Sequence, residues 1–328
     1  MGDEELSNPR LVRSVWASVA GVVLLAGCAF GSHQPSPRPA ASGSKSRPAA
    51  PAVASPAASP KVPPLIRSLR VVPAAVSQGD TVDIRLSFNA APAAWQLTVN
   101  GTPYPAYPVG VDRYRLLLGT DPWSATGSFQ VLLSARGPAG TVQAATGYRV
   151  LPRAYPRRTV TLPSGKVALL SPQVGQEEEA LAGAALAVRT DRQLWSGPFQ
   201  EPIPGAPIDS PYGEQGVYNG RLEWFHGGVD FTAKTGTPVH AAAAGMVTLA
   251  RHLPRGGDTV IVNHGQGVFS EYLHLSRSEV AVGQVVSAGQ VVGLVGATGL
   301  TTGPGLHWGV FVNGIPVDPL SWAQNPPA

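Results

Sequence analysis

Residues 226–231 read His226-Gly-Gly-Val-Asp230-Phe231, and this short motif is the most informative part of the sequence. It places an imidazole and a carboxylate four residues apart, and on an extended segment residues i and i+4 lie on the same face. Two such donors suit Zn²⁺, which takes four N, S or O ligands in proteins. A third protein ligand with one open position would make such a site catalytic rather than structural. A His-x-x-x-Asp pair alone occurs by chance in any long chain, so the surrounding sequence has to support it.

Further short motifs follow this pair in order. They are Gly236-Thr-Pro-Val239, Ala243-Ala-Gly-Met-Val247, Asn263-His-Gly265, Tyr272-Leu-His-Leu-Ser276 and Gly299-Leu-Thr-Thr-Gly-Pro-Gly-Leu-His-Trp308. The series lies within residues 208–322 and resembles the lysostaphin-type (LytM-like) zinc metallopeptidases, which cleave peptide cross-links of bacterial peptidoglycan. The resemblance implies a mostly β fold, with a lysostaphin-type antiparallel sheet in the catalytic domain.

The resemblance also implies roles for individual residues. His226 and Asp230 would be zinc ligands, His307 the third ligand, and one Zn²⁺ would bind per chain. His274 would assist the attacking water and the developing oxyanion. This chemistry is reasonable on general grounds, because zinc polarises a scissile carbonyl and a neighbouring imidazole can move a proton. The implied substrates are peptidoglycan peptides.

The chain departs from the family pattern in two places. The family normally has Pro-His-Leu-His where this chain has Pro304-Gly-Leu-His307, so Gly305 stands at the second catalytic histidine position. The family often has an arginine after a Phe-Gly pair, where this chain reads Tyr212-Gly-Glu-Gln215. The complete ligand set favours an endopeptidase. Gly305 favours the alternative, a degenerate non-catalytic envelope factor that binds cell wall or regulates an amidase.

The N-terminal sequence indicates export. Arg10 and Arg13 precede the apolar run 15–25, and the chain's single cysteine ends the sequence Leu25-Ala-Gly-Cys28. A charged region, a short apolar run and small residues are typical of a signal peptide. The ending resembles a bacterial lipobox, so we expect residues 1–28 to be a signal peptide with lipid attachment at Cys28. This anchors the protein to a membrane, on a periplasmic or extracellular face; the alternative is a plain N-terminal anchor with an incidental cysteine.

Composition divides the rest of the chain. Residues 29–64 are rich in Pro, Ala and Ser and predict a disordered tether. Residues 65–152 contain short alternating runs, among them 80–88 and 95–99, and predict a small Ig-like β-sandwich. Residues 153–200 form a connector with one expected helix over 176–192, whose glutamates 177–179 form a solvated face. Residues 201–328 form the metallopeptidase domain, where a repeated Gly-Gln-Val-Val unit at 283–292 predicts successive hairpins.

The net charge and the remaining histidines indicate no further function. The 328 residues carry a net charge of +4 without a basic cluster, which argues against nucleic-acid binding. We expect His264 in a turn, His252 in a loop and His240 at the surface. Trp308 and Trp322 are expected in the core or lining a groove.

Overall fold

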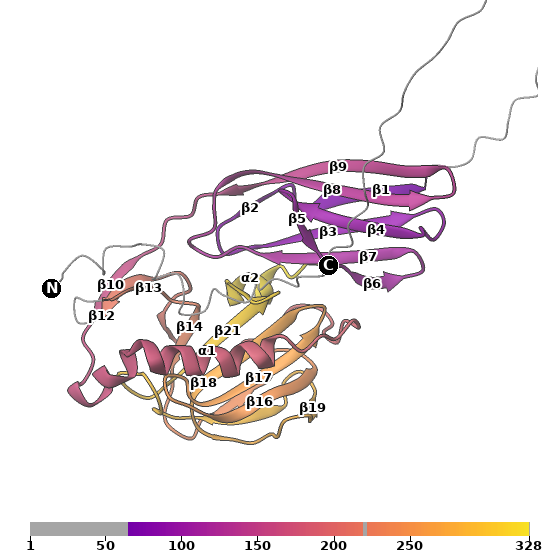
Figure 1. The fold of residues 1–328 in the computed structure, drawn as a ribbon. Helices are drawn as coiled ribbons and strands as arrows, with labels where there is room; N and C mark the ends of the chain where they lie inside the picture. Colours follow the sequence, from indigo (N-terminus) through magenta and orange to yellow (C-terminus); the bar gives the residue numbers. More distant parts are fainter. Residues whose placement is uncertain (1–64, 219–221, 328) are drawn as a thin grey trace, which may run out of the picture. The chain divides into compact units, whose positions relative to one another are not determined.

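The computed structural model describes residues 65–218 and 222–327, and these are mostly β-strand (Figure 1). The predicted fold class is therefore confirmed. The predicted signal peptide, Cys28 and the tether lie outside the described residues.

Two sheets formed by residues 66–151 face each other. One has the order β1(Ile66–Val72), β3(Thr81–Phe88), β7(Arg113–Gly119), β6(Tyr107–Gly110). The other has the order β2(Ala75–Ser77), β9(Gly140–Leu151), β8(Gly127–Gly137), β4(Ala94–Val99), β5(Thr102–Tyr104). Alternate residues of β3, such as Val82, Ile84 and Leu86, are buried with Leu97 and Val131 of the second sheet. The alternation read from the sequence thus gives the buried face of a sandwich.

The connector contains one strand and two helices. These are β10(Arg157–Val160), the 3-10 helix η1(Ser164–Leu170) and α1(Pro172–Leu186). The predicted helix bounds, 176–192, were wrong at both ends. The side chain of Ser171 caps α1 and Pro172 occupies its first turn. After Leu186 the backbone turns to β17, where the Asn263 side chain donates to the Val188 carbonyl at 2.8 Å.

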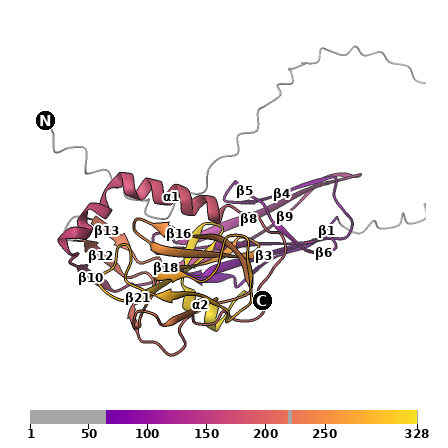
Figure 2. The ribbon, with the colours of Figure 1, turned by 90° about the horizontal axis from the view of Figure 1, so that it is seen from below.

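The prediction of a solvated glutamate face on α1 was wrong for Glu178. This residue is 1% exposed, whereas Glu177 is exposed and Glu179 is half-buried. Ala182 and Ala185 of the same helix pack on Leu249 and Ile261. Figures 1 and 2 show α1 lying along the sheet that carries β16 and β17.

The C-terminal part is built on a large antiparallel sheet. Its order is β11(Ile208–Ser210), β14(Gly228–Thr232), β21(Gly305–Val312), β18(Val268–Ser278), β17(Gly257–Gly265), β16(Gly245–Leu253), β19(Val285–Val286). Three more strands join it, because β15(Pro238–His240) pairs with β20(Val291–Val295), β20 with β18, and β22(Ile315–Val317) with β21. A small sheet of β10, β12(Gln215–Tyr218) and β13(Leu222–Phe225) and the helix α2(Pro319–Gln324) complete this part.

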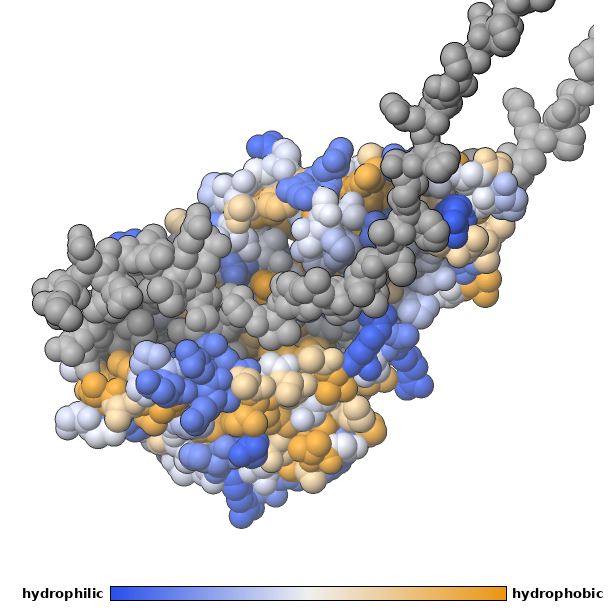
Figure 3. Space-filling model, viewed as in Figure 1, coloured by the Kyte–Doolittle hydropathy of each residue, from blue (hydrophilic) through white to orange (hydrophobic). Residues whose placement is uncertain are grey.

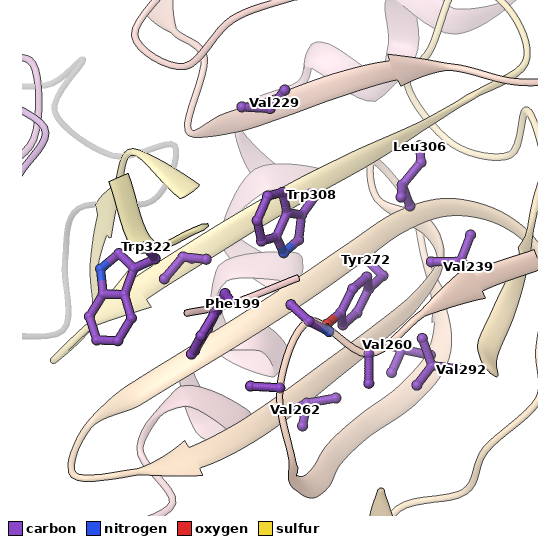
Figure 4. Packing of buried hydrophobic residues seen from close by; sticks show 14 of the residues in the cluster. Phe199, Val229, Val239, Val260, Val262, Tyr272, Val292, Leu306, Trp308 and Trp322 are labelled. Carbon is purple, nitrogen blue, oxygen red and sulfur yellow. The ribbon is translucent and has the colours of Figure 1, made fainter. Parts of the chain in front are cut away.

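The core of this part is dominated by valines and aromatic rings. Trp308 on β21 lies opposite Tyr272 on β18, and both are fully buried. Trp322 of α2 is buried against Phe199, with ring centroids 5.0 Å apart. Figure 4 shows these side chains together with the surrounding valines. Both tryptophans are core residues, which is one of the two expected positions.

The repeated Gly-Gln-Val-Val units do not form hairpins with each other. The first supplies β19, which pairs with β16, and the second supplies β20, which pairs with β15 and β18. The units share a turn instead, in which the glutamine side chain accepts from a backbone N–H three residues earlier: Gln284 from Ala281 and Gln290 from Ser287. The sequence repeat therefore encodes a repeated turn rather than a repeated pairing.

Two histidine predictions were wrong. His264 lies within β17, is 0% exposed and contacts the Ala244 carbonyl and Ser270 Oγ, each at 2.8 Å. His252 lies in β16 rather than in a loop, with Nδ1 2.8 Å from Asp258 Oδ1. His240, which was expected at the surface, ends β15, and its half-buried ring meets the Pro202 carbonyl at 3.1 Å.

The surface combines polar and apolar residues. On the face shown in Figure 3, hydrophilic side chains lie over α1 among more apolar neighbours. Within residues 65–218 and 222–327, no helix has the length and apolar character needed to cross a membrane.

The buried His264 predicts an acid-sensitive core. Burial lowers the pKa of His264 to about 4, so the folded protein keeps it neutral where the unfolded chain, with a pKa near 6.5, takes up a proton. Its stabilising effect is therefore complete above pH 6.5 and is lost as pH falls toward 4. Between pH 7 and 5 we expect His264→Gln to lose about 2 kcal/mol less unfolding free energy than wild type. Urea unfolding at both pH values measures this, and equal losses would contradict it.

Candidate metal centre and catalytic histidine

Strand pairing brings two of the predicted ligands together. Asp230 of β14 lies directly opposite His307 of β21 in antiparallel register, although 77 residues separate them in sequence. His226 precedes β14 and reaches the same point. His226 Nε2, His307 Nδ1 and Asp230 Oδ1 lie 2.9 Å from one another. The structure thus gathers the residues that the sequence proposed as ligands.

The ring of His226 is oriented by contacts to Nδ1, the nitrogen that points away from Asp230 and His307. Its Nδ1 lies 3.0 Å from the Pro211 carbonyl, which can only accept, so Nδ1 carries the proton in the neutral ring. Ser210 Oγ lies 3.0 Å from the same nitrogen and donates to Glu214 at 2.7 Å. Nε2 is therefore left with its lone pair directed at Asp230 and His307.

Glu271 plays the corresponding role for His307. Its Oε1 lies 3.5 Å from His307 Nε2, and the side chain is 2% exposed. Within the part of the chain that the structure describes, Glu271 Oε2 has no hydrogen-bond partner. A buried carboxylate behind a histidine fixes its tautomer and makes the opposite nitrogen a stronger ligand. His307 Nδ1 therefore also presents a lone pair to the centre.

This arrangement fits a metal ion. Three lone-pair donors that meet at 2.9 Å repel one another unless a cation lies among them. Two imidazole nitrogens and one carboxylate oxygen form a donor set that zinc uses at catalytic sites. Without a metal ion a proton supplies this positive charge: burial opposes charge on His307, but its hydrogen bonds to Asp230 and Glu271 prevail and raise its pKa to about 9. A metal ion that binds here would displace that proton. Although burial disfavours its charge, the pKa of Asp230 is held well below its usual range by His226 and His307.

His274 lies beside the three donors, with its ring centroid 6.4 Å from that of His307. Burial, with repulsion from His307, lowers the pKa of His274 to about 4, so the ring is neutral at physiological pH. Nδ1 lies 3.0 Å from the Thr298 carbonyl and must donate to it. Nε2 is then free of a proton and able to accept one.

The backbone of His274 is unusual. Its φ of 64° is in the left-handed region, which costs a non-glycine residue about 1–3 kcal/mol. The residue lies where the pairing of β17 with β18 shifts register, between Val260–Tyr272 and Asp258–Leu275. Such bulges re-aim side chains next to active sites. The bulge here turns the His274 ring out of the strict alternation of β18.

Gly305 stands two residues before His307 on β21 and opposite Thr232. Residues two apart on a strand point to the same side. A Cβ added at Gly305 would lie 2.9 Å from the Phe231 carbonyl oxygen, so a side chain there requires a small backbone shift. Whether a histidine at this position would assist the reaction stays a prediction.

A cavity of about 330 Å³ opens over the centre. Its walls include the three donors and His274, together with residues of the connector such as Thr161, Leu170 and Glu179. Sequence reasoning missed the contributions of Glu271, Ser210 and the connector. A signal existed for Glu271, because it is an acidic residue within the apolar strand Val268–Ser278.

The segment that carries this site is similar to known proteins. The sequence profile of peptidase family M23 matches residues 224–319. The peptidoglycan DD-endopeptidase ShyA of Vibrio cholerae is 44% identical over 29% of this chain and 22% of its own length. The DD-carboxypeptidase/endopeptidase Mpg of Neisseria meningitidis is 40% identical over 39% of this chain and 29% of its own. The chain thus spans less than a third of the length of these relatives. The lysostaphin catalytic domain of Staphylococcus simulans is 32% identical over 38% of this chain and 96% of that domain, with a TM-score of 0.34.

The glycine pair between His226 and Asp230 offers a matched test of the centre. A Cβ at Gly228 would lie 2.4 Å from the Trp308 carbonyl and 2.7 Å from His307 Nε2, whereas at Gly227 it would only touch Pro316 at 3.7 Å. Gly228→Ala should therefore displace His307 and lower bound zinc at least severalfold, and Gly227→Ala should not. Zinc per folded chain, measured by elemental analysis, decides this. Equal zinc in the two variants would show that the close packing at Gly228 does not set the centre.

Proposed function

From the premise that residues 224–319 form a peptidase M23 domain, we propose that the chain is a zinc-dependent endopeptidase acting on peptide cross-links of bacterial peptidoglycan during cell-wall remodelling. The observation that carries the proposal is the meeting of His226, Asp230 and His307 at 2.9 Å beside a neutral His274. A carbonyl or carboxylate contacts one nitrogen of each histidine ring, so the other nitrogen is the one available at the centre.

The substrate class rests on the relatives. ShyA and Mpg bear the names of a peptidoglycan DD-endopeptidase and a DD-carboxypeptidase/endopeptidase. The family match over residues 224–319 of this chain includes the proposed ligand set and the histidine of the Tyr272–Ser276 motif. We extend the same substrate class, cross-linked peptides of the cell wall, to this protein and place it in the cell envelope.

The proposed reaction assigns a task to each residue. His226, Asp230 and His307 would hold one zinc ion per chain, which when bound supplies a Lewis acid for the scissile carbonyl. His274 accepts a proton from the attacking water at Nε2, because Nδ1 is already committed to Thr298. Glu271 and the Pro211 carbonyl keep the ligand rings in the tautomers that binding requires.

The second candidate is a non-catalytic envelope factor that binds cell wall or regulates an amidase. One observation favours it: Gly305 leaves a single imidazole, that of His274, to assist the reaction. The oriented rings of His226 and His307 weigh against it, since a binding module needs no such arrangement. We therefore retain the endopeptidase as the main proposal.

The remaining organisation of the chain is also proposed. Residues 1–28 would be a signal peptide ending in lipidated Cys28, followed by a tether over 29–64. The sandwich would span 65–152, the connector 153–200 and the metallopeptidase domain 201–328. A lipid anchor at Cys28 and an extended tether suit an enzyme that stays at a membrane while it reaches the cell wall.

The proposed function is tested with purified protein and purified peptidoglycan. We expect about one zinc per chain, release of cross-link cleavage products by wild type, and loss of both zinc and products in His307→Ala, because one of three ligands is removed. Chromatography of the muropeptides and elemental analysis provide the two measurements. Products that persist from zinc-free His307→Ala would show that hydrolysis does not depend on this centre.

The role of Gly305 is tested by restoring the family's histidine. We expect Gly305→His to raise turnover by roughly tenfold or more at unchanged zinc content, since a second imidazole can stabilise the oxyanion. Gly303→His is a matched control, because a Cβ at Gly303 meets nothing within 4 Å. Absence of products from both wild type and Gly305→His, with zinc bound, would favour the regulatory candidate.

A further inference from the structure

Glu178 of α1 is a buried carboxylate that the proposed reaction does not use. Its Oε2 accepts the backbone N–H of Arg255 at 2.6 Å, and its Oε1 accepts that of Gly256 at 2.9 Å. A carboxylate that receives two converging N–H groups holds the backbone between them firmly. The connector helix is therefore hydrogen-bonded to the tight turn between β16 and β17.

That turn in turn supports His274. The Gly256 carbonyl accepts the backbone N–H of His274 at 2.7 Å. His274 occupies the left-handed conformation of the β18 bulge, which persists only when surrounding contacts hold it. One residue thus links the two side chains' surroundings, because Gly256 directs its N–H to Glu178 and accepts the backbone N–H of His274 at its carbonyl.

The other side of His274 is fixed to the same turn. Its Nδ1 donates to the Thr298 carbonyl, and Thr298 Oγ1 accepts the N–H of Asp258 at 2.9 Å. Leu300 donates its N–H to the Arg255 carbonyl at 2.6 Å. A displacement of residues 255–258 would therefore move both the backbone and the ring contacts of His274.

Arg255 strengthens the attachment from the opposite direction. Its guanidinium donates to the Leu169 carbonyl at 2.8 Å and to the Ser171 carbonyl at 3.0 Å, at the junction of η1 and α1. A connector side chain thus binds the backbone of the turn, and a turn side chain binds the backbone of the connector, with the turn as donor in each bond. The sequence segment that matches the family begins at residue 224, so Glu178 and its helix lie outside it.

We propose that Glu178 is a positioning residue for His274, acting through the backbone N–H and carbonyl of Gly256, and that the connector is part of the catalytic apparatus rather than a spacer. The catalytic meaning of this link rests on the proposed function; the physical link between the residues does not.

Glu178→Gln tests the link with little change in size. An amide has one acceptor oxygen, and its NH₂ group would face one of the two N–H donors, so one of the bonds is lost. Glu177→Gln is the matched control, because it removes the same charge from an exposed neighbour on the same helix. Both variants are made in the full chain and loaded with zinc.

Two measurements test the structural link between Glu178 and His274 and its effect on catalysis separately. The first is the side-chain NMR spectrum of ¹⁵N-histidine-labelled protein, in which we expect the His274 resonances to shift in Glu178→Gln and to stay unchanged in Glu177→Gln. The second is kinetics on cross-linked muropeptides, where Glu178→Gln should lower kcat about tenfold with KM within about twofold and zinc content unchanged. Lack of cleavage by wild type would refute the proposed function, and the spectra alone would then decide the link.

Unchanged His274 resonances in folded Glu178→Gln would overturn the proposal. An increase in kcat would also overturn it, because α1 would then act as a lid over the cavity. If Glu178→Gln does not fold, Glu178→Asp replaces it, since a shorter carboxylate keeps the charge but draws the turn toward the helix. The same displacement of the His274 resonances is then expected, and its absence counts equally against the link.

Discussion

The antiparallel pairing of β14 with β21 is the constraint on which the site depends. It places Asp230 directly across from His307, and the main-chain ladder fixes that register over several residue pairs. A slip of one residue in either strand would turn that strand's ligand to the opposite face of the sheet. The buried side chain next to that ligand, Val229 or Trp308, would then have to leave the core. Core packing and ligand geometry are therefore specified by the same pairing.

Around this pair the protein builds a layer of acceptors that sets the protonation of each ring. The Pro211 carbonyl, the Glu271 carboxylate and the Thr298 carbonyl each face the N–H of one histidine ring as an acceptor. Each of these acceptors comes from a different element of the fold. Each of the three imidazoles thus keeps its other nitrogen available for metal binding or proton transfer.

The connector changes how the chain should be divided. By composition it is a linker with one charged helix, yet Glu178 is among the most buried carboxylates of the described residues. Its helix forms part of the cavity wall, and its hydrogen bonds end on the turn that carries the Gly256 carbonyl to His274. The glutamates at 177–179 look alike in sequence, and only the fold distinguishes the central one from its neighbours.

The sequence by itself determined the alternation of β3, the turn residues, the family resemblance and the candidate ligands, because these depend on local periodicity and on short motifs of fixed spacing. It could not show that Glu271 lies behind His307, that His264 is buried within a strand, or that the two Gly-Gln-Val-Val units join different strands. Nor could it place Glu178 against Gly256, since 78 residues separate them. These relations were decided by the tertiary structure alone, because they depend on which strands pair and which helix face meets the sheet. Such contacts arise from the packing of the whole chain, and no local pattern of residues encodes them.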